Sequence, residues 1–539
     1  DAPAQTDALP TQIIYGWEIK SESDGETNDL QSLVSIINAY APAETPINFT
    51  VLSQQAQAVI GTESLNSVSA QLWGLCQTIS QETSGHTSRL IDLSNDSTGN
   101  LSSLEIRQLV QECFQPYDLQ QRQIAYRHAQ RWVRTYEALS LPEVPSVPVL
   151  KPGGTYLIAG DLVEGLGMVY AQALVKQLGA RLILIGRPGL PAAAEWEKWL
   201  LTHGPQHSVS QLIRKLQALG EVGKQHLWFS GDLTDAPWVS NCIQQGIAQF
   251  GEITGVFHAG VMGDRASCPL NELTISHTKV IGIQSIQKAL ANHTVDFYLL
   301  QSSLSTIVGG SGFAAYAAAN SYLDTLAHQQ NSETTQWLSL NWDACQLDDT
   351  AAEQTSSNLM ALALTPEEIW ETTQRVLAQP QLCQAIVSPR DLQSRLAEAF
   401  APQEKVPKPV EDDAATNQLK AHSRPALTTD YIAPRTPVEQ KVAQAMGELL
   451  GIDAVGVEDN FFELGGHSLL AIQAVTRLRQ EYQVDLPMRA FLFEAPTIAG
   501  IAKIIEEQIG EIPADTQATL ESLLDDVEAM LPEEVKNEV

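Results

Sequence analysis

The sequence is poor in cationic residues and in cysteine. Its 539 residues hold 32 Lys plus Arg against 64 Asp plus Glu, a formal net charge of −32. Because this charge repels phosphate backbones and anionic lipid surfaces, we expect neither nucleic acid nor a membrane as a partner. The six cysteines have no CxxC or metal-ligand spacing. They indicate reduced, mostly buried thiols of a cytoplasmic protein, without disulfides or a structural metal.

Long hydrophobic runs and a signal sequence are lacking as well. No apolar run reaches the roughly 18 residues that a membrane helix needs, and the start at Asp1 has no basic-then-apolar pattern. A start without Met suggests a piece of a longer polypeptide. The length predicts about three or four structural units at roughly 150 residues each.

Two breaks in composition divide the chain. Prolines among charged residues, with few large apolar side chains, indicate a linker over 401–430. The closely spaced prolines of 141–148 favour an extended crossing between two subdomains. We therefore predict five segments, 1–148, 149–400, 401–430, 431–510 and 511–539. The acidic last segment has apolar residues at helical spacing, which fits a docking helix or a solvated linker helix.

The two longest segments are predicted to have α/β folds. In the second, continuous apolar strands alternate with helices, which is typical of a doubly wound parallel sheet. Its predicted strands are 155–158, 182–185, 255–258 and 297–300, and its first predicted helix is 166–178. The first segment has similar strands, at 12–15, 49–52 and 89–93. No glycine-rich turn follows them, so we predict a Rossmann-like scaffold without a cofactor site.

A glycine-rich turn follows the strand at 155–158 and precedes a helix. Gly160, Gly165 and Gly167 leave bare backbone at the helix N-terminus, where a pyrophosphate can bind. The alternative is a structural turn, because the motif alone is weakly specific.

Three later strand ends support a dinucleotide site. Arg187 follows the next strand, and its guanidinium can pair with the extra phosphate of NADP, which favours NADPH over NADH. The other two ends place further candidates at the same carboxyl edge, namely Asp232, Leu233, Ala259 and Gly260.

Four polar residues form a candidate catalytic group. Tyr316 and Asn320 are four apart and share one helical face. A phenol with a pKa near ~10 is a slow proton donor at neutral pH. Lys279 could lower that pKa, and Ser303, after a strand, could share the substrate oxygen. Each residue alone also fits an ordinary structural role.

Ser468 is a candidate for covalent modification. It lies in Asp459-Asn460-Phe461-Phe462-Glu463-Leu464-Gly465-Gly466-His467-Ser468-Leu469-Leu470, where two glycines permit a tight turn before a helix with apolar spacing. A second amphipathic helix is predicted over 437–450. The alternative for Ser468 is an ordinary N-capping serine.

These motifs resemble two protein families. Lys279, Ser303, Tyr316 and Asn320, with the flank 317–324, resemble the tetrad of modular (type I) polyketide synthase ketoreductase domains, which are of the short-chain dehydrogenase/reductase type. The run 71–75 is similar to the structural subdomain of that family. The region around Ser468 resembles acyl and peptidyl carrier proteins, which are small four-helix bundles that bear 4'-phosphopantetheine on the matching serine.

The resemblance implies a function. It implies NADPH-dependent reduction of a β-ketoacyl thioester, carried on phosphopantetheine at Ser468, to a β-hydroxyacyl thioester. The implied partners are a phosphopantetheinyl transferase and the ketosynthase, acyltransferase and downstream domains of the same assembly line. Asp264 matches the aspartate that marks a D-hydroxyl product in the family, and Val308 stands where a Trp marks the opposite product.

Two departures from the family pattern concern the cofactor site. The first glycine turn is one residue longer and contains Asp161 and Glu164, whose carboxylates could oppose a pyrophosphate. Because the loop is longer, we expect these carboxylates to turn towards solvent. His258-Ala259-Gly260 is one residue shorter than the usual motif. One alternative is therefore a silent reductase-like scaffold with a carrier. Another is a carrier in a peptide-forming line, which a hybrid polyketide and peptide pathway would reconcile with the reductase.

Overall fold

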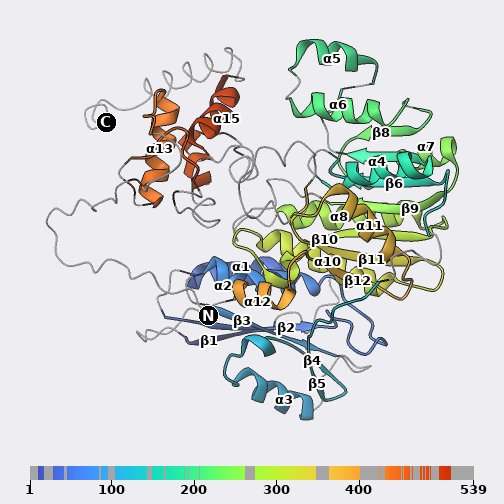
Figure 1. The fold of residues 1–539 in the computed structure, drawn as a ribbon. Helices are drawn as coiled ribbons and strands as arrows, with labels where there is room; N and C mark the ends of the chain where they lie inside the picture. Colours follow the sequence, from blue (N-terminus) through green and yellow to red (C-terminus); the bar gives the residue numbers. More distant parts are fainter. Residues whose placement is uncertain are drawn as a thin grey trace, which may run out of the picture. The chain divides into compact units, whose positions relative to one another are not determined.

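The computed structural model describes the larger part of the chain (Figure 1). The described residues are 10–16, 28–41, 45–83, 86–94, 103–141, 149–162, 165–186, 189–191, 193–204, 207–221, 223–260, 274–346, 363–400, 424, 431–450, 452, 454–461, 464, 474–475, 477–479, 481–482, 484, 486 and 497–510. The predicted tail and most of the predicted linker lie outside these residues. The chain divides into two compact units, one reaching Lys408 and the other beginning at Pro409.

The first unit begins with a five-stranded sheet whose strands follow one another in sequence order. The strands are β1 (Gln12–Tyr15), β2 (Asn48–Gln54), β3 (Thr87–Leu93), β4 (Gln123–Arg127) and β5 (Gln130–Val133). All pair in parallel except β5, which turns back along β4. The three predicted strands of this segment are confirmed. The order never reverses along this sheet, so these five strands lack the topological switch point at which α/β proteins bind ligands.

Helices cover both faces of this first sheet. Apolar side chains of α1 (Asn28–Tyr40) and α2 (Ala70–Glu82) pack on one face. The other face packs against α3 (Ser103–Cys113), which a short 3-10 helix, η2 (Leu119–Gln121), follows in the chain.

A buried ion cluster fills the carboxyl edge of the first sheet. Arg127, at the end of β4, pairs with Asp92 at 2.5 Å and with Glu63 at 3.2 Å. Asp92, near the end of β3, also accepts a hydrogen bond from Ser53 Oγ at 2.7 Å. Because a buried charge is tolerated only when it is paired and hydrogen-bonded, these side chains fix one another. The edge that would hold a ligand in a doubly wound sheet is thus occupied by protein.

The second sheet has seven parallel strands in the order β12-β11-β10-β9-β6-β7-β8. They are β6 (Thr155–Gly160), β7 (Arg181–Gly186), β8 (His226–Ser230), β9 (Ile253–Ala259), β10 (Phe297–Ser303), β11 (Gln336–Trp342) and β12 (Gln384–Val387). From β6 the chain first winds to one side and then, from β9, to the other. This confirms the predicted doubly wound fold and places a topological switch point between β6 and β9.

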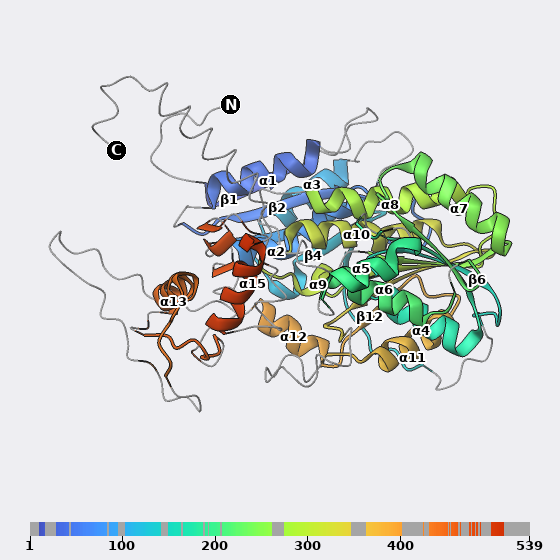
Figure 2. The ribbon, with the colours of Figure 1, turned by 90° about the horizontal axis from the view of Figure 1, so that it is seen from above.

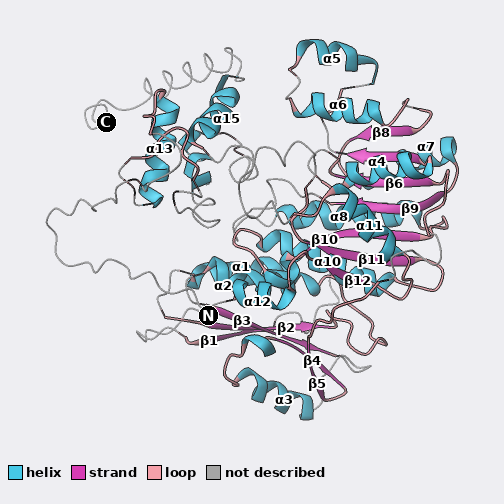
Figure 3. Cartoon of the chain, in the orientation of Figure 1, coloured by secondary structure: helices cyan, strands magenta, loops and turns pink. Residues whose placement is uncertain are grey.

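Helices cover both faces of the second sheet (Figure 3). One face packs against α4 (Gly167–Leu178), α6 (Ser208–Ala218) and α11 (Pro366–Leu377), and the other against α7 (Ala236–Phe250), α8 (Thr274–Leu290) and α10 (Ala314–Gln330). The remaining short elements are η3 (Ala193–Glu195), α5 (Trp196–Thr202), α9 (Ser305–Val308) and α12 (Leu392–Ala399).

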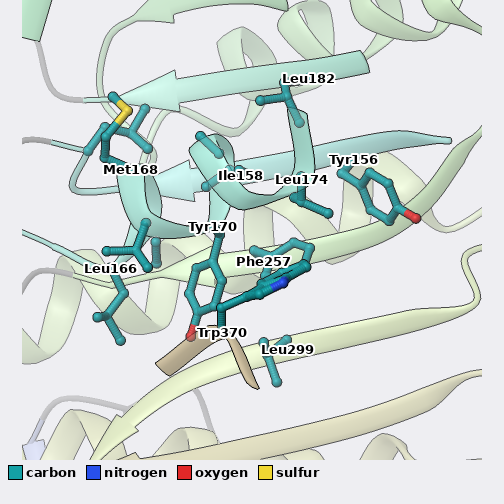
Figure 4. Close-up of a cluster of buried hydrophobic side chains, with 14 of the residues drawn as sticks. Tyr156, Ile158, Leu166, Met168, Tyr170, Leu174, Leu182, Phe257, Leu299 and Trp370 are labelled. Carbon is teal, nitrogen blue, oxygen red and sulfur yellow. The ribbon is translucent and has the colours of Figure 1, made fainter. Parts of the chain in front are cut away.

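Alternate residues of each buried strand serve opposite faces of this sheet. Tyr156 and Ile158 of β6 enter the core beneath α4, where Tyr170 meets Phe257 with ring centroids 4.9 Å apart (Figure 4). Their neighbour Leu157 enters the core on the opposite face. Within the described residues, no helix is both long and apolar enough to cross a membrane.

The two sheets belong to one unit because α2 of the first half packs against α10 of the second (Figure 2). A Cβ atom on Gly74 would lie 2.1 Å from the backbone oxygen of Ala317. The helices therefore touch backbone to backbone at this point, which only glycine permits. Thr325 Oγ1, farther along α10, donates a hydrogen bond to Ala56 O at 2.8 Å.

The second unit contains α13 (Pro437–Leu450) and α15 (Ile498–Gly510), which pack around an apolar cluster. The predicted helix over 437–450 is confirmed. Asp459 is fully buried and accepts two hydrogen bonds from the Arg424 guanidinium, at 2.6 and 2.7 Å. Arg424 lies within the predicted linker, yet this bidentate pair attaches it to the second unit.

Candidate active site

The structure brings the four predicted catalytic residues together at the carboxyl edge of the second sheet. Ser303 ends β10, Tyr316 and Asn320 lie in the first two turns of α10, and Lys279 lies on α8. Lys279 Nζ donates a hydrogen bond to Asn320 Oδ1 and lies 4.9 Å from the centroid of the Tyr316 ring. The side chains of Asn320 and Ser303 act on the Tyr316 phenol, and both lower its pKa. Residues from three elements thus converge on one phenol.

Burial dominates the acidity of Tyr316, which is 4% exposed. Burial raises the pKa of Tyr316 to about 12, and its hydrogen bonds with Asn320 and Ser303 act in the opposite direction. The net shift of this pKa is therefore upward, opposite to the predicted lowering, because removing the phenolate from water costs more than its hydrogen bonds return. The phenol consequently keeps its proton throughout the physiological pH range.

Lys279 is an almost fully buried cation, at 3% exposure. Burial lowers the pKa of Lys279 to about 7, and attraction to Asp324 opposes this shift. Burial, followed by the charge of Lys279, also lowers the pKa of His258 to about 3, so His258 is neutral. A Cβ on Gly260 would lie 2.1 Å from Lys279 Cε. Gly260 therefore gives the lysine stem its space.

Asp324 and Asn341, which were not predicted as site residues, form a polar network behind the four residues. Asn341 Nδ2 donates to Asp324 Oδ2 at 2.8 Å and to Ser302 Oγ at 3.0 Å. Ser339 Oγ donates to Asp324 Oδ1 at 2.6 Å. The available signals were the spacing of four between Asn320 and Asp324 and a polar Asn341 in an apolar strand. The network fixes the carboxylate that faces Lys279.

A cavity of about 1050 Å³ reaches Asp324 from another direction. It is lined by the β4–β5 hairpin, by β12 and by Ser321, Thr325 and His328 of α10. None of the four predicted catalytic residues lines it, so this cavity is separate from the candidate active site.

The predicted cofactor glycines lie at the topological switch point. Gly160 ends β6 with a φ of 134°, and a Cβ there would lie 1.7 Å from Ala259 O. Gly167 begins α4, and Gly165 lies in the turn before it. This turn puts bare backbone at a helix N-terminus beside the ends of β6 and β9, which fits a dinucleotide pyrophosphate.

The expectation that Asp161 turns towards solvent is wrong. Asp161 is 2% exposed, because its N–H donates to Ala259 O at 2.8 Å and extends the β6–β9 pairing by one residue. The turn then folds back over it, so that a Cβ on Gly165 would lie 2.6 Å from Asp161 O. Glu164 lies outside the described residues.

The other predicted site residues fall into two groups. Asp232 follows β8, is exposed and accepts a local hydrogen bond from Thr234 N at 2.9 Å. Leu233 lies against Gly282 of α8, where an added Cβ would approach it within 3.3 Å. Arg187, Asp264 and Ser468 lie outside the described residues.

We expect the buried Lys279 to make stability depend on pH. Between about pH 7 and the ordinary lysine pKa of 10.5, the unfolded chain binds a proton that the folded protein does not. The free energy of unfolding should therefore rise with pH across this window relative to Lys279→Met. Urea unfolding at about pH 6.5 and pH 9.5, followed by tryptophan fluorescence, measures the difference. All ten tryptophans precede residue 371, so the signal comes from the first unit.

The matched control for this measurement is Lys288→Met, which removes an exposed lysine from the same helix. It should show the same pH dependence as wild type. Equal pH dependence in the wild type and in Lys279→Met would contradict a depressed pKa for Lys279.

Comparisons with known proteins agree with the geometry. Residues 154–346 match the family model of the KR domain, and residues 440–505 match that of the phosphopantetheine attachment site. A ketoreductase domain from the bacillaene assembly line shares the fold, with a TM-score of 0.54 at 18% identity, covering 74% of this chain and 97% of that one.

Two curated relatives match this chain over stretches of different length. The sequence is 27% identical to 5-methyl-1-naphthoate synthase of Streptomyces sahachiroi over 388 residues, which are 68% of this chain and 21% of that protein. It is 45% identical to gramicidin S synthase 2 of Brevibacillus brevis over 82 residues, which are 15% of this chain and 2% of that protein. The chain therefore spans about a fifth or less of the length of these relatives.

Proposed function

Because the chain joins a KR domain to a phosphopantetheine attachment domain, we propose that it reduces a β-ketoacyl thioester to a β-hydroxyacyl thioester within an assembly-line module. The substrate is carried on 4'-phosphopantetheine at Ser468. The observation that carries this proposal is the buried contact of Lys279 with Asn320 and with the Tyr316 ring, at the carboxyl edge of a doubly wound sheet. A proton donor in this position, beside a dinucleotide turn, is what the reduction of a ketone requires.

Each residue of the site has a separate role in the transfer of the proton to the substrate. NADPH, bound at the glycine turn, would supply the hydride that the β-carbon accepts. Tyr316 donates its proton to the carbonyl oxygen as that oxygen becomes an alkoxide, and Ser303 holds the same oxygen. Lys279 stabilises the phenolate that remains, and its pKa near 7 suits the return of a proton. Asn320 holds the ammonium group in place.

Because the carrier segment and the reductase belong to one chain, weak binding between them is sufficient for the reductase to reach its substrate. A substrate attached to the same chain reaches an effective concentration of the order of mM when the connection is short and flexible. Loading requires a phosphopantetheinyl transferase, and we propose ketosynthase, acyltransferase and downstream domains of the same cytoplasmic assembly line as the other partners.

A hybrid polyketide and peptide line is the form of assembly line that the similarities favour. An 82-residue stretch, about the length of the carrier segment, is 45% identical to gramicidin S synthase 2, whereas a ketoreductase domain from the bacillaene assembly line shares the fold over 74% of this chain. The alternative is a silent scaffold. It is supported by the carboxylate of Asp161 in the glycine turn, because a negative charge there would repel the pyrophosphate of a dinucleotide. Binding of NADPH separates an active reductase from a silent scaffold.

Tyr316→Phe should lower the turnover of a soluble β-keto thioester by about 10²–10⁴-fold, because it removes a positioned proton donor and retains the ring. Affinity for NADPH should change little. Steady-state kinetics monitored by NADPH absorbance measure both. The control is Tyr322→Phe, later on α10, whose hydroxyl accepts a hydrogen bond from Gln284. Unimpaired turnover in Tyr316→Phe would mean that another group protonates the alkoxide.

Ser468→Ala should abolish covalent loading, since only the serine hydroxyl can form the phosphodiester with the arm. Reduction of a soluble ketone should survive, because the four reductase residues are untouched. Mass spectrometry after incubation with coenzyme A and a phosphopantetheinyl transferase gives the answer. An equal mass gain in wild type and variant would refute the attachment site.

Arg187→Ala should weaken the binding of NADPH much more than that of NADH, because only NADPH has the phosphate that a guanidinium can hold. Calorimetric titration of both cofactors measures this difference. Arg181→Ala, which removes the exposed arginine at the other end of β7, serves as the control. A wild-type protein that binds no NADPH would favour the silent scaffold.

The product should carry the D-configured 3-hydroxyl. Asp264 matches the aspartate that marks this outcome in ketoreductases of this kind, and Val308 replaces the tryptophan that marks the opposite one. Chiral chromatography of the alcohol formed from a 3-oxoacyl thioester determines the configuration, and a predominantly L product would reject the assignment.

A further inference from the structure

The helix that carries Tyr316 has no side-chain cap of its own. Phe313 is the residue before α10, and its side chain cannot accept a hydrogen bond. The first N–H groups of a helix lack intrahelical partners, and Tyr316 is the third residue of α10. The proposed acid therefore lies in the turn that is most prone to unwind.

Glu82, at the end of α2 in the other half of the unit, supplies the missing cap. Its Oε1 accepts a hydrogen bond from Gly312 N at 3.0 Å. The N–H of Ala314 also faces the carboxylate and lowers its pKa. Ala314 is the first residue of α10. A carboxylate at this position satisfies unpaired N–H groups and interacts favourably with the positive end of the helix dipole.

The preceding turn is held from the same side. Gln81 Nε2 donates to Val308 O at 2.8 Å, and Gln81 Oε1 accepts from Gly310 N. Arg122 Nη2 donates to Ile307 O at 3.2 Å. Three side chains of the cofactor-free half, Gln81, Glu82 and Arg122, thus bind the backbone that leads into α10. We call these three residues the turn clamp.

The sequence of the clamped turn fits this arrangement. Gly309, Gly310 and Gly312 have φ values of 73°, 143° and 79°, which other residues adopt only with strain. A Cβ on Gly309 would also lie 2.4 Å from Gln77 O on α2. The turn follows this path because α2 lies directly against it. Contacts with α2 therefore help to keep the turn in this conformation.

We propose that Glu82 is a positioning residue for the reduction, holding the first turn of α10 wound so that the Tyr316 phenol stays beside Ser303 and Lys279. The inference rests on the proposed function for its effect on turnover. The half of the unit without a cofactor site thereby takes part in the geometry of the reaction. A displacement of about 1 Å in a reacting group can cost around 100-fold in rate.

Protonation of Glu82 should make turnover depend on pH near 7. A variant that only loses stability would not change this pH dependence. Burial raises the pKa of Glu82 to about 7, and hydrogen bonds from Gly312 and Ala314 act in the opposite direction. None of the described ionisable side chains contributes to this shift, and the cation of the clamp, Arg122, binds Ile307 and lies over the Phe400 ring. The cap is ionised above about pH 7 and weakens as the pH falls through that value. Turnover should therefore decline on the acid side.

The kinetic test uses the full chain, NADPH and a soluble β-keto thioester. Glu82→Ala should lower kcat by between about 10- and 100-fold, with the KM for NADPH changed less than about twofold. Glu82→Gln keeps an acceptor oxygen, so it should lose less activity, and its acid limb near pH 7 should disappear. Glu197→Ala removes an exposed glutamate from α5 and should match wild type.

Hydrogen exchange separates this inference from the proposed function. In Glu82→Ala, amides of 312–320 should exchange faster than in wild type, and this holds even if the wild type reduces nothing. Unchanged exchange in this segment would overturn the cap. If the wild type is active, an unchanged kcat in Glu82→Ala would also overturn the inference. If Glu82→Ala does not fold, Glu82→Gln decides, and an acid limb that persists in that variant would overturn the inference.

Discussion

A buried ammonium ion is the constraint on which the candidate site depends. Lys279 has little contact with water, so its charge must be compensated by protein groups. Asn320 accepts its hydrogen bond, the Tyr316 ring presents a face to it, and Asp324 attracts it through the interior. The glycine at position 260 is part of the same requirement, because any side chain there would displace the lysine stem. The positions of these four residues therefore depend on one another, because each of the other three compensates the charge of Lys279.

The two halves of the first unit use similar sheets in different ways. Strand order reverses in the second sheet and not in the first, so of the two sheets the second has the topological switch point at which α/β proteins bind ligands. In the first sheet Arg127, Asp92 and Glu63 fill that edge with paired charges. This half instead presents α2 to the other half. Its contribution is the surface on which α10 and the turn before it are built.

Local patterns were sufficient to predict the strands β1, β2, β3, β6, β7, β9 and β10, the helix over 437–450 and the convergence of Tyr316 with Asn320. Spacing along one element, or a motif at a strand end, contains that information. The burial of Asp161 was not predictable, because it depends on a hydrogen bond with Ala259 in another strand. The contact of Glu82 with Gly312 joins residues 230 positions apart. No local pattern indicates such a pair, and only the packing of α2 against α10 creates it.

The backbone contact between Gly74 and Ala317 has a consequence for protein engineering. Chimaeric synthases are made by exchanging segments, and the proline-rich stretch near residue 145 looks like a natural splice point. A splice there would join an α2 from one parent to an α10 from another, across an interface with no room for a single extra carbon atom. The exchangeable part is therefore the whole first unit, from the strand at Gln12 to the helix ending at Ala399.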